Sequence, residues 1–244
     1  MIPLKQLVRV KRVGTSAMIS RVLTVLALVA GLSACAIKPM SDEERANQIV
    51  QAAKMTLQKF KASNDHPMEQ YRALLPKAQG IVILPGVVKG GFVLAAEGGS
   101  GVLLAKDASG RWGYPAFYLM ASGSVGLQMG AQMGDVVLLV FSQDAVAAII
   151  ESQGKLGADL GLVLGTVGAG VEASTTTNVG ADILAFTQGI GAFAGGSLEA
   201  SALIKRNDLN QAFYGQAIGP ADIVLQGNAQ NPAADSLRAA LDAQ

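Results

Sequence analysis

Apolar and polar residues alternate along several glycine-rich stretches of the chain. In Lys155–Gly165, leucine or alanine occupies every second position, and glycine, aspartate or valine stands between them. A period of two is typical of a β-strand, whereas three interior glycines would destabilise a helix. Val125–Gly134 and Gly189–Ile204 repeat the pattern. We predict a strand in each, and we expect the glycine-bearing faces to let a backbone, a helix or a ligand approach closely.

Two segments in the N-terminal third of the chain have the pattern of helices. Ser41 and Glu44 form a capping box at the start of an apolar stripe that runs to Phe60. A shorter helix is predicted from about Pro67 to Leu75. The stripe of the first helix has two interpretations, packing on the sheet or binding to a membrane surface. We expect packing, because the polar face of this helix is not strongly basic.

Further along the chain, apolar runs and turn residues predict a sheet with helices between its strands. The strands are Ile81–Leu84, Phe92–Glu97, Val102–Lys106, Arg111–Met120, Val136–Phe141 and Val179–Thr187. Gly98, Gly99 and Ser100 have the spacing of a hairpin turn, and Asp107–Gly110 predict a second turn. Helices are predicted after Ser142, over Asn207–Tyr214 and over Ala233–Leu241. The predicted class is α+β, with a mostly antiparallel, glycine-rich, twisted or barrel-like sheet and flanking helices.

Charge is distributed unevenly along the chain. Residues 1–34 contain five basic side chains and no acidic one, which leaves 14 basic against 18 acidic residues in the remainder. A nucleic-acid-binding protein normally has a basic face, so this composition argues against a nucleic-acid partner. The part after residue 34 is long enough to bury roughly 70% of its unfolded surface, so it needs neither a disulfide nor a metal to fold.

The single cysteine, Cys35, follows a pattern typical of an export signal. Arg21 precedes the apolar run Val22–Gly31, which is too short to span a bilayer but has the length of a signal h-region. The quartet Leu32–Cys35 resembles the bacterial lipoprotein signal, in which the cysteine thiol receives a diacylglyceryl group before cleavage in front of it. We therefore predict lipid attachment at Cys35, with acyl chains such as palmitate that each add about 0.8 kcal/mol of membrane binding per buried methylene.

These segments divide the chain into four parts. We predict a lipoprotein signal peptide at 1–34, a tether at 35–40, one domain at 41–216 and a peripheral C-terminal tail at 217–244. Met18 lies directly before the apolar run and gives a more compact translation start than Met1. Ala36, rather than aspartate, follows the cysteine, and by resemblance to lipoprotein sorting this predicts the outer membrane, with the protein facing the periplasm.

Catalytic and metal-binding chemistry have little support in the sequence. A serine or cysteine hydrolase needs a positioned base, and the only histidine, His66, stands at a predicted helix start, where it is expected to face solvent or cap the helix. Four carboxylates, Asp159, Glu172, Asp182 and Glu199, are spread over several segments and would bind Ca²⁺ only if the sheet brought them together. We expect exposed carboxylates instead, and hence no enzyme, cofactor or metal.

The region between Lys77 and Gly215 resembles the SYLF-domain family. The matching blocks follow one order: Lys77–Gly80, Lys89–Phe92, Gly101–Leu103, Trp112 with Pro115–Tyr118, Lys155–Asp159, Phe193–Glu199 and Tyr214–Gly215. The resemblance implies a non-catalytic, lipid-binding module of bacterial envelope proteins and of eukaryotic membrane and actin regulators. Eukaryotic members bind phosphoinositides with the help of a basic amphipathic N-terminal segment; the helix predicted here carries four basic and three acidic residues.

Two functions are open at this point. The first is uptake of lipid or an apolar envelope component by a glycine-lined sheet surface or an adjoining cleft. Its candidate contacts are basic or aromatic residues of the matched blocks: Lys89, Phe92, Arg111, Trp112 and Lys155. The second is a structural or interaction protein, whose glycines serve only the fold and whose partner is another envelope protein. We expect the first.

Overall fold

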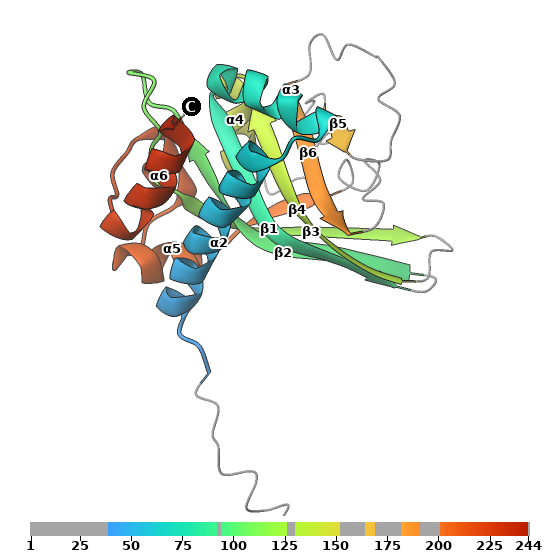
Figure 1. The fold of residues 1–244 in the computed structure, drawn as a ribbon. Coiled ribbons are helices and arrows are strands. Elements are labelled where there is room, and N and C mark those ends of the chain that lie inside the picture. The colour runs from blue at the N-terminus through green and yellow to red at the C-terminus, as the bar shows by residue number, and fades with distance from the viewer. Residues whose placement is uncertain are drawn as a thin grey trace, which may run out of the picture. The chain divides into compact units, whose positions relative to one another are not determined.

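The computed structural model describes residues 39–91, 94–125, 130–151, 164–168, 182–190 and 201–243. Its strands are β1 (Gly80–Gly91), β2 (Leu94–Ala105), β3 (Ala116–Val125), β4 (Gly130–Val140), β5 (Leu164–Gly168), β6 (Ile183–Ile190) and β7 (Ala202–Lys205). They form one sheet in the order β5-β6-β4-β1-β2-β3-β7 (Figure 1). Only the pair β5–β6 is parallel. No pairing between described residues joins β5 to β7. The predicted α+β class is thus confirmed, with a twisted, open sheet.

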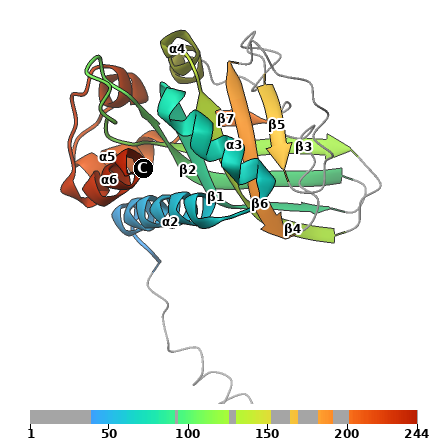
Figure 2. The same ribbon diagram turned by 45° about the horizontal axis from the view of Figure 1, so that its top comes forward.

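Helices cover both faces of the sheet. They are α2 (Asp42–Ala62), α3 (His66–Leu74), α4 (Gln143–Glu151), α5 (Asn207–Tyr214) and α6 (Asp235–Asp242), with the short 3-10 turns η1 (Leu75–Lys77) and η4 (Pro232–Ala234) and the π-helix η3 (Ala221–Leu225). Residues of α2, α3, α5 and α6 share one apolar cluster with one sheet face. Residues of α4 and η3 share a second cluster with the other face. Figure 2 shows α2 and α4 on opposite sides of the strands.

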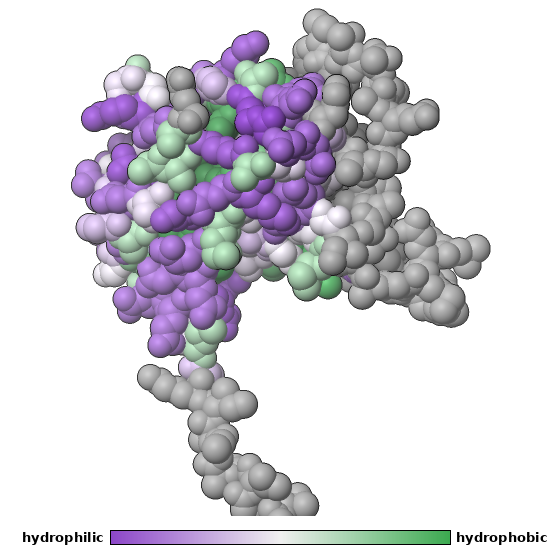
Figure 3. Space-filling view, viewed as in Figure 1, coloured by the Kyte–Doolittle hydropathy of each residue, from purple (hydrophilic) through white to green (hydrophobic). Residues whose placement is uncertain are grey.

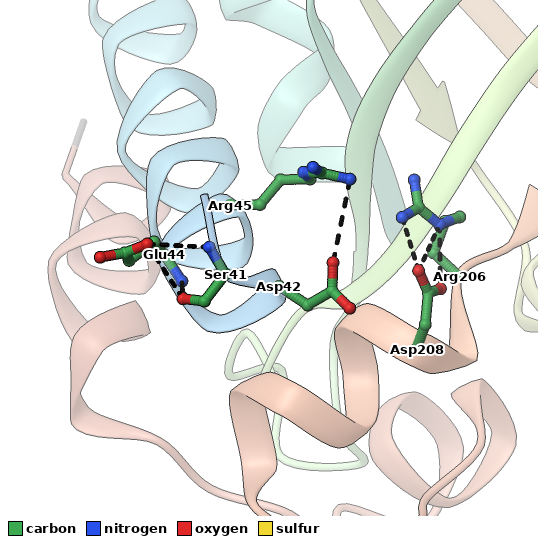
Figure 4. Close-up of polar contacts among 6 residues, drawn as sticks. All are labelled: Ser41, Asp42, Glu44, Arg45, Arg206 and Asp208. Carbon is green, nitrogen blue, oxygen red and sulfur yellow. Dashed lines mark hydrogen bonds and ion pairs between the residues drawn. The ribbon is translucent and has the colours of Figure 1, made fainter. Parts of the chain in front are cut away.

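The first helix begins at the predicted capping box. Glu44 N donates to Ser41 Oγ at 3.2 Å, and Ser41 N donates to a carboxylate oxygen of Glu44 at 2.8 Å (Figure 4). The hydrogen bonds that this carboxylate accepts from Ser41 N and Ser41 Oγ hold the pKa of Glu44 below its ordinary value. Val50, Leu57 and Phe60 of the apolar stripe are fully buried in the larger cluster. The stripe therefore packs on the sheet, as expected, and the polar face of α2 remains exposed.

Strand β1 contains one extra residue relative to its neighbours. Pro85 and Gly86 together lie opposite the single residue Asp135 of β4. Gly86 has φ of 57°, and its N–H donates to Asp135 Oδ1 at 2.9 Å. Such a β-bulge bends a strand and accommodates a proline that a regular ladder would exclude. The run Ile81–Leu84 therefore does not end at the proline, and β1 continues to Gly91.

The glycines of β2 lie beside this bulge and not in a turn. A Cβ at Gly101 would lie 2.1 Å from the carbonyl oxygen of Ile83, and a Cβ at Gly99 would lie 2.9 Å from Val87 Cγ2. Contacts that short do not occur between real atoms, so these positions admit no side chain without a shift. The predicted hairpin turn at Gly98–Ser100 is wrong, because β2 passes through these residues as one strand paired with β3.

The other long glycine-rich strands are also divided differently from the prediction. Val125 ends β3 while Gly130 begins β4, and these strands have different partners, so Val125–Gly134 is not one strand. Likewise, Gly189–Ile204 contributes its first residues to β6 and its last to β7, which lie in different parts of the sheet. Of Lys155–Gly165, only the last two residues are described, and they begin β5. Alternation indicated strand residues here but not strand boundaries.

The C-terminal segment differs from the peripheral tail that the sequence predicts. Leu237 of α6 is fully buried and Leu241 is 5% exposed, and both pack in the same cluster as α2. Residues Ser41–Gln244 form one compact unit. In Figure 1, α6 and α5 lie beside α2. The helices predicted over Asn207–Tyr214 and Ala233–Leu241 are both present.

Within the part of the chain that the structure describes, no helix has both the length and the apolar character needed to cross a bilayer.

Replacing Gly101 by alanine tests the contact that fixes the bulge. We expect Gly101→Ala to lower the free energy of unfolding by about 1–3 kcal/mol, because the new methyl group would displace the backbone of Ile83. Gly90→Ala is the matched control, since a Cβ there would have no neighbour within 4 Å. Urea unfolding of both variants measures the difference. Equal stability of the two would show that the close approach at Gly101 is not a constraint.

Candidate functional site

One wall of the candidate site is the loop that joins β2 to β3. Asp107 Oδ1 accepts hydrogen bonds from Ser109 N at 2.8 Å and from Arg111 N at 3.0 Å. Gly110, with φ of 79°, donates its N–H to Asp107 O at 2.9 Å and closes the predicted turn. Trp112 then pairs with Lys106 in an isolated bridge. The turn therefore places Arg111, exposed, next to Trp112, which is only 3% exposed.

The opposite wall comes from the C-terminal segment. The π-helix η3 buries Ile223 and Val224 in the cluster on the α4 side of the sheet, while Leu225 stays 44% exposed. Gly227 follows with φ of 68°, a conformation that favours glycine. Single π-helical turns are rare overall, and those that occur are often found at functional sites. Here the turn and the residue after it place apolar Leu225 and polar Gln226 along the same cavity.

Arg238 of α6 joins the two walls. Its Nε donates to the carbonyl oxygen of Trp112 at 2.9 Å, and its guanidinium carbon lies 4.1 Å from the centre of the Tyr114 ring. Asp235 Oδ1 accepts from Arg238 Nη1 at 3.2 Å and from the Tyr114 hydroxyl at 3.0 Å. Burial and this carboxylate raise the pKa of Tyr114. A cation stacked on a ring and fixed by two hydrogen bonds is well positioned.

Between these walls lies a cavity of about 410 Å³. Polar and apolar groups contribute about equally to its lining, and the apolar residues Ala105, Trp112, Ile223 and Val224 are the buried ones. It is lined by Ala105, Asp107, Arg111, Trp112, Gly113, Tyr114, Ile223, Val224, Leu225, Gln226, Gly227, Gln230 and Arg238. Small-molecule sites have volumes of roughly 300–1,000 Å³ and combine an apolar lining with a few polar groups, so the cavity has the size and character of a ligand site.

The remaining polar clusters of the described residues have structural roles. At the N-terminal end of α2, Asp42 pairs with Arg45 at 3.8 Å, and nearby Arg206 pairs with Asp208 at 2.6 Å (Figure 4). The hydrogen bond from Arg206 lowers the pKa of Asp208. Within the described ranges, no three His, Cys, Asp or Glu side chains gather as metal ligands. Asp182 is the one described member of the four scattered carboxylates, and the side chain of His66 is not described.

Comparison with known proteins identifies the family. The family described as Las17-binding protein actin regulator, Ysc84, matches residues 121–244, about half of the chain. The chain belongs to the Ysc84 family. The SYLF resemblance inferred from the sequence is thereby confirmed. The matched region includes the η3 and α6 wall of the cavity but not the loop wall.

Relatives of the Ysc84 domain occur in larger eukaryotic proteins. SH3 domain-containing YSC84-like protein 1 of Bos taurus is 34% identical over 171 residues, which are 69% of this chain and 50% of that protein. The Xenopus laevis protein of the same name is 35% identical over 59% of this chain and 43% of its own. LAS seventeen-binding protein 3 of Saccharomyces cerevisiae is 33% identical, over 66% and 35%. The match therefore spans half or less of these relatives, and none of their names denotes an enzyme.

The cavity of the Ysc84 domain contains two of the five candidate contacts. Arg111 and Trp112 line it together. Lys89 does not, because it lies in β1 beyond the bulge, opposite Glu97 of β2 and Gln132 of β4. Phe92, Lys155 and the predicted lipid attachment site Cys35 lie outside the described residues. The grouping of Arg111 with Trp112 follows from their adjacency in sequence and from the Asp107 turn.

Sequence analysis missed the C-terminal wall. Leu225, Gln226, Gln230 and Arg238 all line the cavity, yet they belong to the segment that was taken as a peripheral tail. A signal was present: Ala234, Leu237 and Leu241 recur at helical spacing, which indicates a buried helix face and hence a docked segment. Nothing in the sequence shows that this helix docks against the β2–β3 loop.

The dependence of the free energy of unfolding on acidic pH tests the turn that carries Arg111. The pKa of the Asp107 carboxyl is lowered from 3.8 to about 2, mainly by hydrogen bonds from the Ser109 side chain and the Arg111 backbone. A carboxyl whose pKa is lower when folded stabilises the fold above its unfolded pKa and loses this effect as pH falls through its folded pKa. We expect wild type and Asp107→Asn to differ in free energy of unfolding by a constant amount above about pH 5.

That difference should shrink between about pH 4 and pH 2 as the wild-type carboxyl is protonated. Urea unfolding of both proteins across this range measures it, and taking the difference removes the titration of all other groups. A difference that does not change with pH would contradict the role assigned to the charged carboxylate.

Proposed function

We propose that this protein is a membrane-anchored envelope lipoprotein whose Ysc84 domain binds lipid without catalysing a reaction. The single observation that carries lipid binding is the cavity of about 410 Å³, whose lining combines buried apolar side chains with the guanidinium groups of Arg111 and Arg238. The anchor rests on the sequence alone, through Cys35 and the signal before it. Ala36 after the cysteine supports an outer-membrane location facing the periplasm.

The lipid anchor and the domain contribute differently to membrane binding in this proposal. Acyl chains on Cys35 would hold the protein at the membrane, since each buried methylene contributes about 0.8 kcal/mol. The domain itself needs no strong membrane affinity. On the molecular face that Figure 3 shows, the described surface is mostly hydrophilic, and its hydrophobic residues form separate areas. This face therefore offers no broad apolar surface to a membrane, and we expect a lipid to be bound locally, at the cavity.

A second candidate function is binding of a protein partner in the envelope without a lipid ligand. The family description names a Las17-binding protein and actin regulator, and one relative is named as a LAS seventeen-binding protein. Both names favour a protein partner for those proteins. Crosslinking in intact cells separates the candidates: one dominant crosslinked protein with no lipid in the purified chain favours the partner, whereas co-purified lipid found by native mass spectrometry favours the cavity.

The anchor is tested by changing the modified residue. We expect Cys35→Ala to abolish acylation and to move the mature protein out of the membrane fraction, because no other cysteine is present to accept a lipid. Ser33→Ala keeps a small residue in the signal quartet and should remain acylated and membrane-bound. Fractionation and mass spectrometry of the N-terminal peptide measure both. A native protein with an unmodified mature N-terminus would refute the anchor.

Lipid binding by the domain is tested without the anchor. The chain from residue 36 onward keeps the whole compact unit Ser41–Gln244. We expect it to float with vesicles of phosphatidylethanolamine, phosphatidylglycerol and cardiolipin, and we expect Leu225→Glu, a charge at the exposed edge of the cavity, to reduce the bound fraction several-fold. Met55→Glu is the control, since Met55 is 67% exposed on α2, far from the cavity lining. Absence of flotation with every lipid class, together with no lipid retained by the purified domain in native mass spectrometry, would refute lipid binding.

A further inference from the structure

The size of the cavity limits what it can hold. At about 410 Å³, it lies near the lower end of the range for small-molecule sites, roughly 300–1,000 Å³. A diacyl phospholipid, with two long chains and a headgroup, is far larger. The apolar part of the lining comes from a few residues on two walls: Ala105 and Trp112 on one, and Ile223, Val224 and Leu225 on the other. That surface suits one alkyl chain segment, so a bilayer lipid would place only part of one chain there.

The carboxylates in and beside the cavity already accept hydrogen bonds, whereas the guanidinium groups keep free donors. Asp107 uses both carboxylate oxygens within its own loop, accepting from Ser109 and Arg111. Asp235 Oδ1 already accepts from Arg238 and Tyr114. Each guanidinium carries five N–H groups, and these hydrogen bonds use only part of them. The cavity is therefore suited to a ligand group that accepts hydrogen bonds.

Further donors come from the glutamines of the C-terminal wall. Gln226 Oε1 accepts from Asn228 Nδ2 at 2.8 Å, which orients the amide and directs its NH₂ group away from that bond. Gln230 is exposed and lines the same space. Amide donors on the C-terminal wall and the Arg111 guanidinium on the loop wall can bond the same group from two sides.

The two arginines are held with different strength. Arg238 is fixed by Trp112, Tyr114 and Asp235, and its side chain is 28% exposed. Arg111 is 78% exposed; its Nη2 lies 3.3 Å from Asp107 Oδ2, and its Nε donates to Ser109 Oγ at 2.8 Å. Exposed contacts of this kind contribute little to stability, so Arg111 can exchange these partners for a ligand at small cost. Guanidinium groups bind carboxylates and phosphates through paired, charge-assisted hydrogen bonds.

We propose that the cavity binds a single-chain anionic amphiphile: a long-chain carboxylate or a monoacyl phosphate lipid, with its anionic head on Arg111 and the start of its chain between Trp112 and Ile223. This rests on the proposed lipid-binding function and names the ligand class of the same site. Arg111 is the specificity-determining residue, because it is the exposed cation that a head at the edge of the cavity meets. Arg238 contributes a fixed positive charge behind it.

The single tryptophan gives a direct measurement. The chain contains one Trp, and Trp112 lines the cavity, so its fluorescence reports occupancy. The chain from residue 36 onward is titrated with dodecanoate, lauroyl lysophosphatidate, dodecanol, dodecyltrimethylammonium and inorganic phosphate, each below its micelle concentration where it has one, with calorimetry in parallel. We expect the two anionic amphiphiles to bind, and the alcohol, the cation and inorganic phosphate to bind at least about tenfold more weakly.

The matched variants assign the head to Arg111. Arg111→Gln should weaken dodecanoate binding by at least about tenfold and leave dodecanol unchanged, because it removes a charge-assisted pair. Arg45→Gln is the control: Arg45 is 47% exposed and also forms a surface ion pair, with Asp42, but does not line the cavity. Thermal unfolding of both variants shows that the fold is kept.

Each outcome of these titrations decides one question. If dodecanol or the cationic amphiphile bound as tightly as dodecanoate, the requirement for an anionic head would be refuted. If inorganic phosphate bound as tightly as lauroyl lysophosphatidate, the requirement for an alkyl chain would be refuted. Vesicle flotation without binding of any monomeric amphiphile would leave the proposed lipid-binding function standing and refute this ligand class. Equal weakening by Arg111→Gln and Arg45→Gln would refute the role of Arg111.

Discussion

The absence of a side chain at Gly101 is the constraint on which the rest of the sheet depends. The carbonyl oxygen of Ile83 occupies the space where a Cβ would lie, so β1 can approach β2 closely and hold its bulge. At the bulge, Gly86 and Lys59 both bond the carboxylate of Asp135. Since Lys59 belongs to α2, the bulge and the helix over it are fixed by one partly buried carboxylate. The bend of β1 and the position of α2 are thus parts of the same arrangement.

Helix ends transmit that arrangement to the C-terminal segment. The last carbonyl groups of a helix have no partner within it and need an outside donor. Arg72 supplies one at the end of α2, bonding the carbonyl oxygens of Lys61 and Ser63. Lys61 in turn bonds the carbonyl oxygens of Ala240 and Ala243 at the end of α6. Each helix is therefore fixed by a cation from its neighbour, and α6 is held where Arg238 can reach the β2–β3 loop.

The cavity is a consequence of this docking. Its two walls are more than 100 residues apart in sequence, and Arg238 connects them through the backbone of Trp112 and the ring of Tyr114. Trp112 therefore has two roles, since its ring is buried in the larger cluster and also lines the cavity. A buried ring can serve packing alone, whether or not a ligand binds beside it. For this reason, the exposed residues at the edge, and not the buried aromatic ring, are the ones that distinguish lipid binding from a purely structural role.

The sequence by itself determined what depends on neighbours along the chain. The Ser41–Glu44 capping box, the stripe that ends at Phe60, the turn at Asp107–Gly110 and the helix Asn207–Tyr214 are local features, and each is present as predicted. The α+β class followed from the periodicity of apolar residues, and the SYLF family followed from motifs that occur in one order. Only the tertiary structure decided what the glycines of β2 do, because the atom that excludes a side chain at Gly101 belongs to another strand. It also decided where the helix that carries Leu237 docks, and hence that Arg238 borders a site, since docking of a helix is set by contacts far away in sequence.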